Sequence, residues 1–380
     1  MIDYPRIFWN EEGKEKCVRW RSENGTPPPK KLVIADDHLK GEDAYRFACE
    51  GTALLWRGDF QNARQLLQAL ARRIDKKARK IKNTPMMAAD SFHLNRQFKL
   101  HRARILGMLL LPFEQGHRIP LRRAPDVANA CSEVYGLAAE PYIASLRGLQ
   151  GIIGAYEWRK KGVEIPTLPA RIHPYYGVFS PVRGEYVCLV NETPLPKVIQ
   201  SKSVAFDIGT GTGVLAAILA QRGINRIVAT DQDTRAIQCA NENISRLGFS
   251  KVVEVVVADL FPQGRASLIV CNPPWLPARP SSPLEHAIFD PDSRMLQGYL
   301  KGLAEHLESD GEGWLILSDL AEHFGLRTRE ELLASINGAG LKILGKIDTK
   351  PHHPRVSDTN DPLHQARAAE VTSLWRLAVI

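Results

Sequence analysis

Residues 203–275 read SVAFDIGTGTGVLAAILAQRGINRIVATDQDTRAIQCANENISRLGFSKVVEVVVADLFPQGRASLIVCNPPW. Short runs rich in Val, Ile and Ala alternate with segments that have the apolar spacing of amphipathic helices. This alternation predicts parallel β-strands whose sheet is covered by helices on both faces. Each of the four runs ends in glycine or in polar residues, so we expect these groups to meet at one edge of the sheet.

The first run ends in a glycine-rich loop at residues 207–213, DIGTGTG. Glycines let the backbone turn tightly and approach a bound ligand, and the helix that follows directs its first amides toward that ligand. The carboxylate at the strand end can receive an ammonium group. The loop therefore predicts ligand contacts at Asp207, Gly209, Thr210, Gly211 and Gly213.

Two further acids end the next two strands. Asp231 follows the second strand, where a carboxylate suits two ribose hydroxyls because it accepts two hydrogen bonds at once. Asp259 follows the third strand and can accept from an adenine amino group. Together with Asp207 and the glycines, these acids predict a nucleoside-containing ligand. A dinucleotide stays open as an alternative, since residues 211–216 fit the pattern G-x-G-x-x-A.

The fourth strand ends in Asn272-Pro273-Pro274-Trp275. Two prolines prevent further ladder pairing and stiffen the backbone. The Asn272 side-chain oxygen and the Pro273 carbonyl can both accept from one substrate –NH₂, which turns the nitrogen lone pair toward an electrophile. Trp275 offers a flat face for a planar amide or a nucleobase. We therefore predict these four residues to be the catalytic residues of a group transfer to nitrogen.

Together these motifs resemble the class I S-adenosylmethionine-dependent methyltransferases, and among them the N-methyltransferases with an Asn-Pro-Pro-aromatic motif. The similarity is greatest to the protein-(glutamine-N5) methyltransferases that modify peptide release factors, whose D-x-G-T-G-S-G, G-D-x-F and N-P-P-Y-[IL]-P segments read DIGTGTG, ADLF and NPPWLP here. The resemblance covers about residues 175–345. It implies S-adenosyl-L-methionine as the cofactor and a protein glutamine as the acceptor. Related enzymes methylate exocyclic amines of adenine or guanine in RNA or DNA, and this alternative stays open.

The remainder of the chain extends the predicted architecture to a Rossmann-like, seven-stranded mixed sheet, in which the last two strands pair antiparallel. The seven predicted strands lie at residues 204–208, 226–231, 252–259, 266–272, 314–319, 341–348 and 373–380. Leucine-rich spacing predicts an all-α N-terminal domain over residues 41–165, with helices at 41–81, 91–111 and 141–160 and one that starts at Asp126. We expect residues 1–40 to be irregular and residues 201–380 to form the methyltransferase domain. Residues 166–200 are expected to form a linker in which residues 175–190 are either a β-hairpin or a loop that leads into a helix.

Charge is unevenly distributed along the chain. The net charge is +8, but residues 1–170 hold 29 Lys and Arg against 19 Asp and Glu, whereas residues 171–380 hold 21 against 23. A basic N-terminal half favours a macromolecular acceptor, recruited by the helical domain through nucleic acid or an acidic protein face. A non-catalytic protein that binds the cofactor and RNA is the alternative of another class.

The cysteines and the apolar segments argue against a metal-binding, a disulfide-bonded or a membrane protein. The six cysteines are scattered and include no C-x-x-C pair, so we predict neither a metal site nor a disulfide framework. No apolar stretch reaches the length of a membrane span, so no membrane partner is expected. These features favour a cytoplasmic location.

Overall fold

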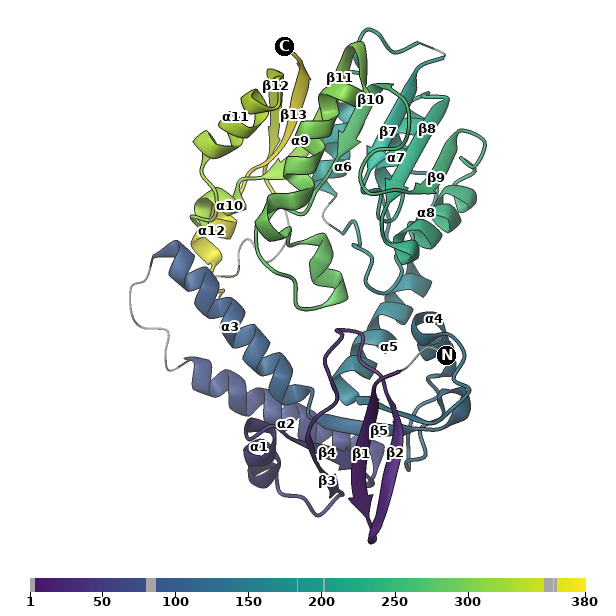
Figure 1. Cartoon of the computed structure of the whole chain (residues 1–380), viewed down its shortest axis with the longest axis vertical. Coiled ribbons are helices and arrows are strands. Elements are labelled where there is room, and N and C mark those ends of the chain that lie inside the picture. Colours follow the sequence, from purple (N-terminus) through teal and green to yellow (C-terminus); the bar gives the residue numbers. More distant parts are fainter. Residues whose placement is uncertain (1–3, 80–86, 183, 201, 352–357, 359–360) are drawn as a thin grey trace. The chain divides into compact units, whose positions relative to one another are not determined.

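The computed structural model describes residues 4–79, 87–182, 184–200, 202–351, 358 and 361–380. The chain divides into two compact units (Figure 1): residues 1–86 with 93–157, and residues 87–92 with 158–380. Each unit contains one β-sheet. Within the described ranges, no helix is both long and apolar enough to cross a membrane.

The C-terminal unit is built on a seven-stranded sheet of order β12-β13-β11-β10-β7-β8-β9. The strands β11, β10, β7, β8 and β9 lie in this order, and each pairs parallel with the next. Strand β13 is antiparallel to both β11 and β12. This arrangement confirms the predicted mixed sheet. The strands are β7 (Val204–Ile208), β8 (Arg226–Asp231), β9 (Val253–Val257), β10 (Ala266–Cys271), β11 (Leu307–Ser318), β12 (Leu341–Thr349) and β13 (Thr372–Val379).

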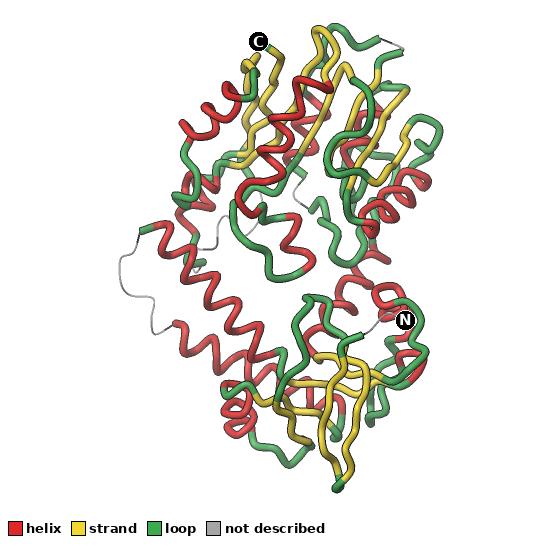
Figure 2. The backbone as a smooth tube through the Cα atoms, viewed as in Figure 1, coloured by secondary structure: helices red, strands yellow, loops and turns green. Residues whose placement is uncertain are grey.

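Helices cover both faces of this sheet, as the tube in Figure 2 shows. One hydrophobic cluster contains Ala205 and Leu268, and a second contains their strand neighbours Phe206 and Ile269. Because successive side chains of a strand point to opposite faces, the two clusters are the cores of the two faces. The helices of this unit are α6 (Glu185–Glu192), α7 (Val214–Gln221), α8 (Thr234–Arg246), α9 (Arg294–His306), α10 (Leu320–His323), α11 (Arg329–Gly338) and α12 (His364–Ala369), with the 3₁₀ turns η2 (Pro283–Ala287) and η3 (Pro291–Ser293).

The segment before this sheet follows one of the two predicted alternatives. The β-hairpin is wrong for the described residues of 166–200, which form loops, one isolated bridge at Ile172 and helix α6. The apolar residues Tyr186, Val187, Leu189 and Val190 are buried on the hydrophobic cluster of Ala205. Their spacing fits one face of a helix, and this packing decides between helix and hairpin.

The N-terminal unit is not the all-α domain that the leucine spacing predicts. It contains a six-stranded sheet of order β1-β2-β6-β5-β4-β3. The strands are β1 (Arg6–Glu11), β2 (Lys14–Trp20), β3 (Lys31–Ala35), β4 (Thr52–Trp56), β5 (Leu109–Phe113) and β6 (Tyr142–Ser145). The helices are α1 (Gly41–Cys49), α2 (Phe60–Arg79), α3 (Ala88–Leu106), α4 (Ala128–Tyr135) and α5 (Leu146–Lys161), with the 3₁₀ turn η1 (Gln115–His117). The first residues of α3, 88–92, and the last residues of α5, 158–161, belong to the C-terminal unit.

The prediction of an all-α N-terminal domain fails for a physical reason. Every residue of β4, TALLW, is buried, so this strand shows no alternation, and leucine is itself a strong helix former. A short apolar run of this kind fits a central strand and a buried helix equally well. The expectation that residues 1–40 are irregular is also wrong, because β1 and β2 form an antiparallel pair there.

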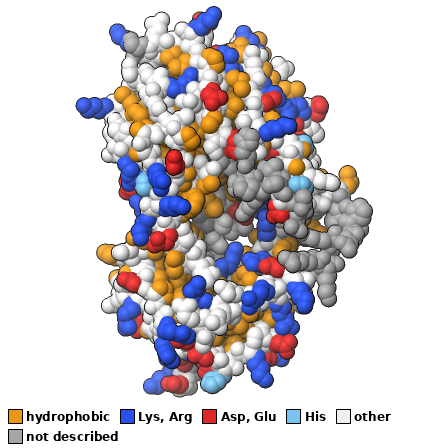
Figure 3. Space-filling view, turned by 180° about the vertical axis from the view of Figure 1, so that it is seen from behind, with side chains coloured by type: hydrophobic (Ala, Val, Ile, Leu, Met, Phe, Trp, Pro, Cys, Tyr) orange, Lys and Arg blue, Asp and Glu red, His pale blue; other side chains and the backbone are white. Residues whose placement is uncertain are grey.

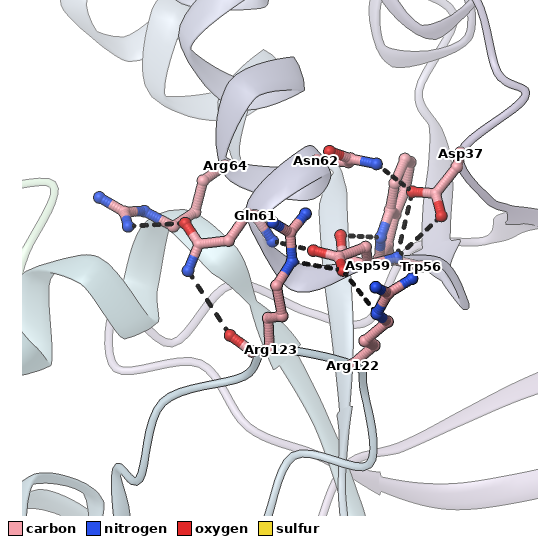
Figure 4. A network of polar contacts seen from close by, with 8 residues as sticks. All are labelled: Asp37, Trp56, Asp59, Gln61, Asn62, Arg64, Arg122 and Arg123. Atoms are coloured by element: carbon pink, nitrogen blue, oxygen red, sulfur yellow. Dashed lines mark hydrogen bonds and ion pairs between the residues drawn. The ribbon is translucent and has the colours of Figure 1, made fainter.

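Helix α2 begins at a polar network that Figure 4 shows in detail. Asp59 is 5% exposed, and its carboxylate accepts from the backbone N–H of Gln61 at 2.8 Å, which caps the helix. The Arg123 guanidinium donates to the same carboxylate at 2.7 Å, and the Arg122 guanidinium lies 3.8 Å away. Asp37 in turn accepts from the backbone N–H of Asp59. The network joins the start of α2 to two neighbouring loops.

Candidate active site

The four strand ends that the sequence singles out lie side by side along one edge of the C-terminal sheet. Cys271, just before Asn272, pairs with Ile208, just before Gly209 of the glycine loop. Ile208 pairs with Thr230, and Asp231 pairs with Val257. Because these strands are parallel, the acceptor motif, the glycine loop and the two acids follow one another along the same edge.

The glycine loop is shaped by close contacts and by left-handed backbone. Gly209 has φ 72°, and a Cβ at that position would collide with Cε of Met295. Gly211 has φ 55°, and a Cβ there would meet no atom within 4 Å. A side chain at Gly209 would therefore displace a neighbour, whereas Gly211 borders open space. An open, side-chain-free backbone is what the close approach of a ligand requires.

Asp207 is fully buried at the end of β7. Its Oδ2 accepts from the Thr210 hydroxyl at 2.7 Å and from the backbone N–H of Ala216 at 3.0 Å, which ties the loop to the first turn of α7. Among the residues that the structure describes, none donates to Oδ1. Burial raises the pKa of this carboxyl to about 6, against the opposing effect of its two hydrogen bonds.

Asp231 holds the other side of the same loop. Its Oδ2 accepts from the backbone N–H of Gly211 at 3.0 Å, and its Oδ1 accepts from that of Asp233 at 3.0 Å. Burial raises the pKa of this carboxyl as well. Each carboxylate oxygen has two lone pairs, so both can accept a further hydrogen bond from a ligand.

Asp259 is the most exposed of the three acids, with 59% of its side chain accessible. The Arg294 guanidinium donates to its Oδ2 at 2.6 Å. The contact joins the segment after β9 to the first residue of α9. The role of Asp259 toward an adenine amino group stays a prediction, and a ligand there would meet Arg294 too.

The Asn-Pro-Pro-Trp corner is organised by its own tryptophan. The indole N–H of Trp275 donates to Oδ1 of Asn272 at 2.9 Å. The ring is partly buried and packs against the hydrophobic clusters on both faces of the sheet. Trp275 therefore fixes the orientation of the amide, in addition to any stacking role, and leaves Oδ1 one lone pair for a substrate N–H.

Two residues that shape this edge are not among the predicted catalytic and cofactor-binding residues. Met295 lies against the glycine loop, and no motif indicates this. Asp290 accepts from the backbone N–H groups of Met295 at 3.0 Å and Leu296 at 3.1 Å, so it caps α9. The pattern Asp290-Pro291 before a helix is a recognisable start signal. The backbone N–H of Asp290 donates to Leu276 at 2.8 Å, so the same residue ties α9 to the acceptor corner.

Comparisons with known proteins find methyltransferases that are similar to part of the C-terminal unit. Residues 177–323 match the family described as "Methyltransferase small domain". A tRNA1(Val) (adenine(37)-N6)-methyltransferase of Pedobacter heparinus is 36% identical over 135 residues, which are 32% of this chain and 57% of that protein. A ribosomal protein L11 methyltransferase of Pelotomaculum thermopropionicum is 40% identical over 80 residues, 20% of this chain and 26% of that protein.

The chain thus spans less than two thirds of either relative. Among solved structures, a ribosomal protein L11 methylase from Lactobacillus delbrueckii subsp. bulgaricus has a TM-score of 0.35 and 16% identity, covering 53% of this chain and 81% of that one. The family match supports a methyltransferase domain within the C-terminal unit, with S-adenosyl-L-methionine as its cofactor. The predicted closeness to glutamine-N5 methyltransferases is not confirmed.

The residues at the sheet edge fit this cofactor. A fully buried carboxylate with an unsatisfied oxygen, Asp207 Oδ1, suits an ammonium group. Asp231 has lone pairs left for ribose hydroxyls, and the backbone at Gly211 is open to close approach. We infer that Asp207, Asp231 and the glycine loop hold the cofactor.

The first prediction concerns Asp207 and pH. An ammonium group at Oδ1 would favour the ionised carboxylate and lower its pKa from about 6. Cofactor binding then releases a proton, so affinity for S-adenosylhomocysteine should increase by up to about tenfold as pH rises toward 7. Calorimetric titration at a series of pH values from below 6 up to 7 would measure the increase in affinity, and Asp207→Asn should remove that increase. An equal pH dependence in both proteins would contradict the assignment.

The second prediction concerns Asp231. Asp231→Ala removes the acceptor for ribose hydroxyls and the bond to the Gly211 N–H, so affinity for the cofactor should fall at least about tenfold. Asp233→Ala is the matched control, because Asp233 is exposed and caps only α8. Calorimetry on both variants measures their affinities for the cofactor. A similar affinity in the two would exclude the ribose role.

Proposed function

We propose that the protein transfers a methyl group from S-adenosyl-L-methionine to the exocyclic amino nitrogen of an adenine in RNA. The observation that carries this proposal is the pairing of Cys271 with Ile208, which sets the two-acceptor corner at Asn272 beside the cofactor loop. The tRNA adenine-N6 methyltransferases among the relatives support a nucleobase acceptor over a protein glutamine.

The chain's own residues would act by positioning. Asn272 Oδ1, oriented by the Trp275 indole, and the adjacent Pro273 carbonyl would accept the two hydrogens of one amino group. The nitrogen lone pair then points out of the plane of those hydrogens. The cofactor supplies an electrophilic methyl on a sulfonium. No strong base is required, because the nitrogen becomes acidic once it is methylated and its proton can leave to water.

The N-terminal unit would recruit the acceptor. The first 170 residues carry a net charge of +10 from 29 basic and 19 acidic residues, which suits a polyanion. On the face drawn in Figure 3, however, Lys and Arg side chains stand in separate groups with Asp and Glu among them. Charge alone therefore supports RNA only weakly. The cytoplasm is the proposed location, since all six cysteines are free thiols.

A transfer experiment tests the acceptor class. The full chain is incubated with unmodified tRNA or with ribosomal protein, each with radiolabelled S-adenosylmethionine. We expect label in tRNA, released by nuclease and found as N6-methyladenosine on nucleoside analysis. Label that protease releases would replace this proposal with methylation of a protein, a reading that the ribosomal protein L11 methyltransferases among the relatives make worth testing.

The third prediction concerns the acceptor corner. Asn272→Ala should lower the turnover number at least about 100-fold, because an acceptor aimed at the reacting amino group is lost. Affinity for S-adenosylhomocysteine should stay within about twofold of wild type. Asn241→Ala is the control, since Asn241 is exposed and its amide donates only to the Ile237 carbonyl on α8. Normal turnover of Asn272→Ala would show that the acceptor binds elsewhere.

A further inference from the structure

The N-terminal unit contains a pocket that the methyltransferase site does not use. Its volume is about 470 Å³, and it lies where β2 ends, lined among others by Arg19, Arg21, Ser22, Glu23, Thr26 and Tyr135. Ligand pockets are commonly of this size. All of the lining residues belong to the N-terminal unit, so the pocket is complete within it.

A buried cation without a countercharge lines this pocket. Arg21 is only 7% exposed. Its Nη1 donates to the Tyr135 carbonyl at 3.0 Å, but its Nε is buried and has no partner among the described residues. Within the same residues, no Asp or Glu oxygen lies within 4.0 Å of the Arg21 or the Arg19 guanidinium. Buried charges are ordinarily paired, so this arrangement lacks an anion.

The groups packed around Arg21 are neutral. Its guanidinium carbon lies 4.8 Å from the ring centre of Tyr135 and 4.9 Å from that of Tyr142. The Tyr142 hydroxyl contacts Nδ1 of His117 at 2.8 Å, and burial lowers the pKa of that imidazole. Burial likewise raises the pKa of the nearby Cys131 thiol to about 11, so it carries no charge at neutral pH. Cation–π contact holds the guanidinium in place but does not neutralise it.

A second cation stands beside the first. Arg19 lies two residues before Arg21 in the extended chain, so both side chains point to the same face. Burial lowers the pKa of Arg21, and the positive charge of Arg19 lowers it further. The Arg19 Nε is also buried without a partner among the described residues. Two other arginines of this unit do face an acid: Arg123 and Arg122 both lie at the Asp59 carboxylate (Figure 4).

We propose that this pocket binds the phosphate group of a nucleotide, with the phosphate between Arg19 and Arg21 and the nucleoside along the wall that contains Trp20 and Tyr135. A phosphate carries up to two negative charges and matches the planar donor pattern of two guanidiniums. The aromatic wall suits a ribose or a base better than it suits a simple anion. The phosphate comes either from a free mononucleotide or from an RNA strand. Neither source depends on the proposed methylation.

Binding measurements on the full chain without S-adenosylmethionine test this site. The probes are cytidine 5′-monophosphate, cytidine and a short RNA oligomer, because a cytosine avoids the adenosine-type cofactor site. We expect the monophosphate to bind at least about tenfold more tightly than cytidine. Arginine-dependent binding of the monophosphate identifies a free nucleotide as the source, and arginine-dependent binding of the oligomer alone identifies a strand.

Three variants keep the test decisive. Arg21→Gln should weaken phosphate-dependent binding about tenfold or more, and Arg19→Gln several-fold. Arg19 is partly exposed, so its variant remains informative if Arg21→Gln fails to fold. Arg64→Gln is the control, because Arg64 is an exposed arginine of the same unit that donates to Gln61. The proposal is overturned if neither the monophosphate nor the oligomer binds, or if cytidine binds as tightly as whichever of these two does. It is also overturned if Arg19→Gln behaves like Arg64→Gln.

Discussion

The parallel pairing of β10 with β7 and of β7 with β8 is the constraint on which the rest of the C-terminal unit depends. Backbone hydrogen bonds fix Cys271 opposite Ile208 and Ile208 opposite Thr230. A shift of one residue would turn each alternate side chain to the other face, and the two hydrophobic clusters that pack against opposite faces oppose such a shift. The sheet therefore sets, without any ligand, which polar groups meet at its edge.

Buried carboxylates turn this edge into a preformed site. Asp207 is held inside the protein by Thr210 and Ala216, and Asp231 holds the Gly211 amide from the neighbouring strand. Burial of these acids without a cation raises their pKa values, so ionising them costs stability in the free protein. A cationic ligand would offset that cost on binding. Arg21 in the N-terminal unit is the converse case: burial lowers the pKa of its guanidinium, and an anionic ligand would offset the cost of keeping it charged.

Much of the C-terminal unit could be predicted because its signals are local. Val- and Ile-rich runs mark the strands, and glycines and acids mark their ends. The contacts that determine function were less visible. The contact of Met295 with Gly209 depends on packing between segments far apart in the chain. The bond from the Ala216 amide to Asp207 is local, but it depends on how the glycine loop folds back onto the first turn of α7. In the N-terminal unit, leucine-rich runs such as β4 are ambiguous, so the sheet was missed.

The central claim is that the cofactor lies across the ends of β7 and β8 with its sulfur toward the Asn272–Pro273 corner. A crystal structure of the protein with S-adenosylhomocysteine tests it most directly. The account predicts the ligand's ammonium at Asp207 Oδ1, its ribose hydroxyls at Asp231 and its sulfur facing Asn272. A ligand bound elsewhere, or with its sulfur directed away from the two prolines, would contradict it.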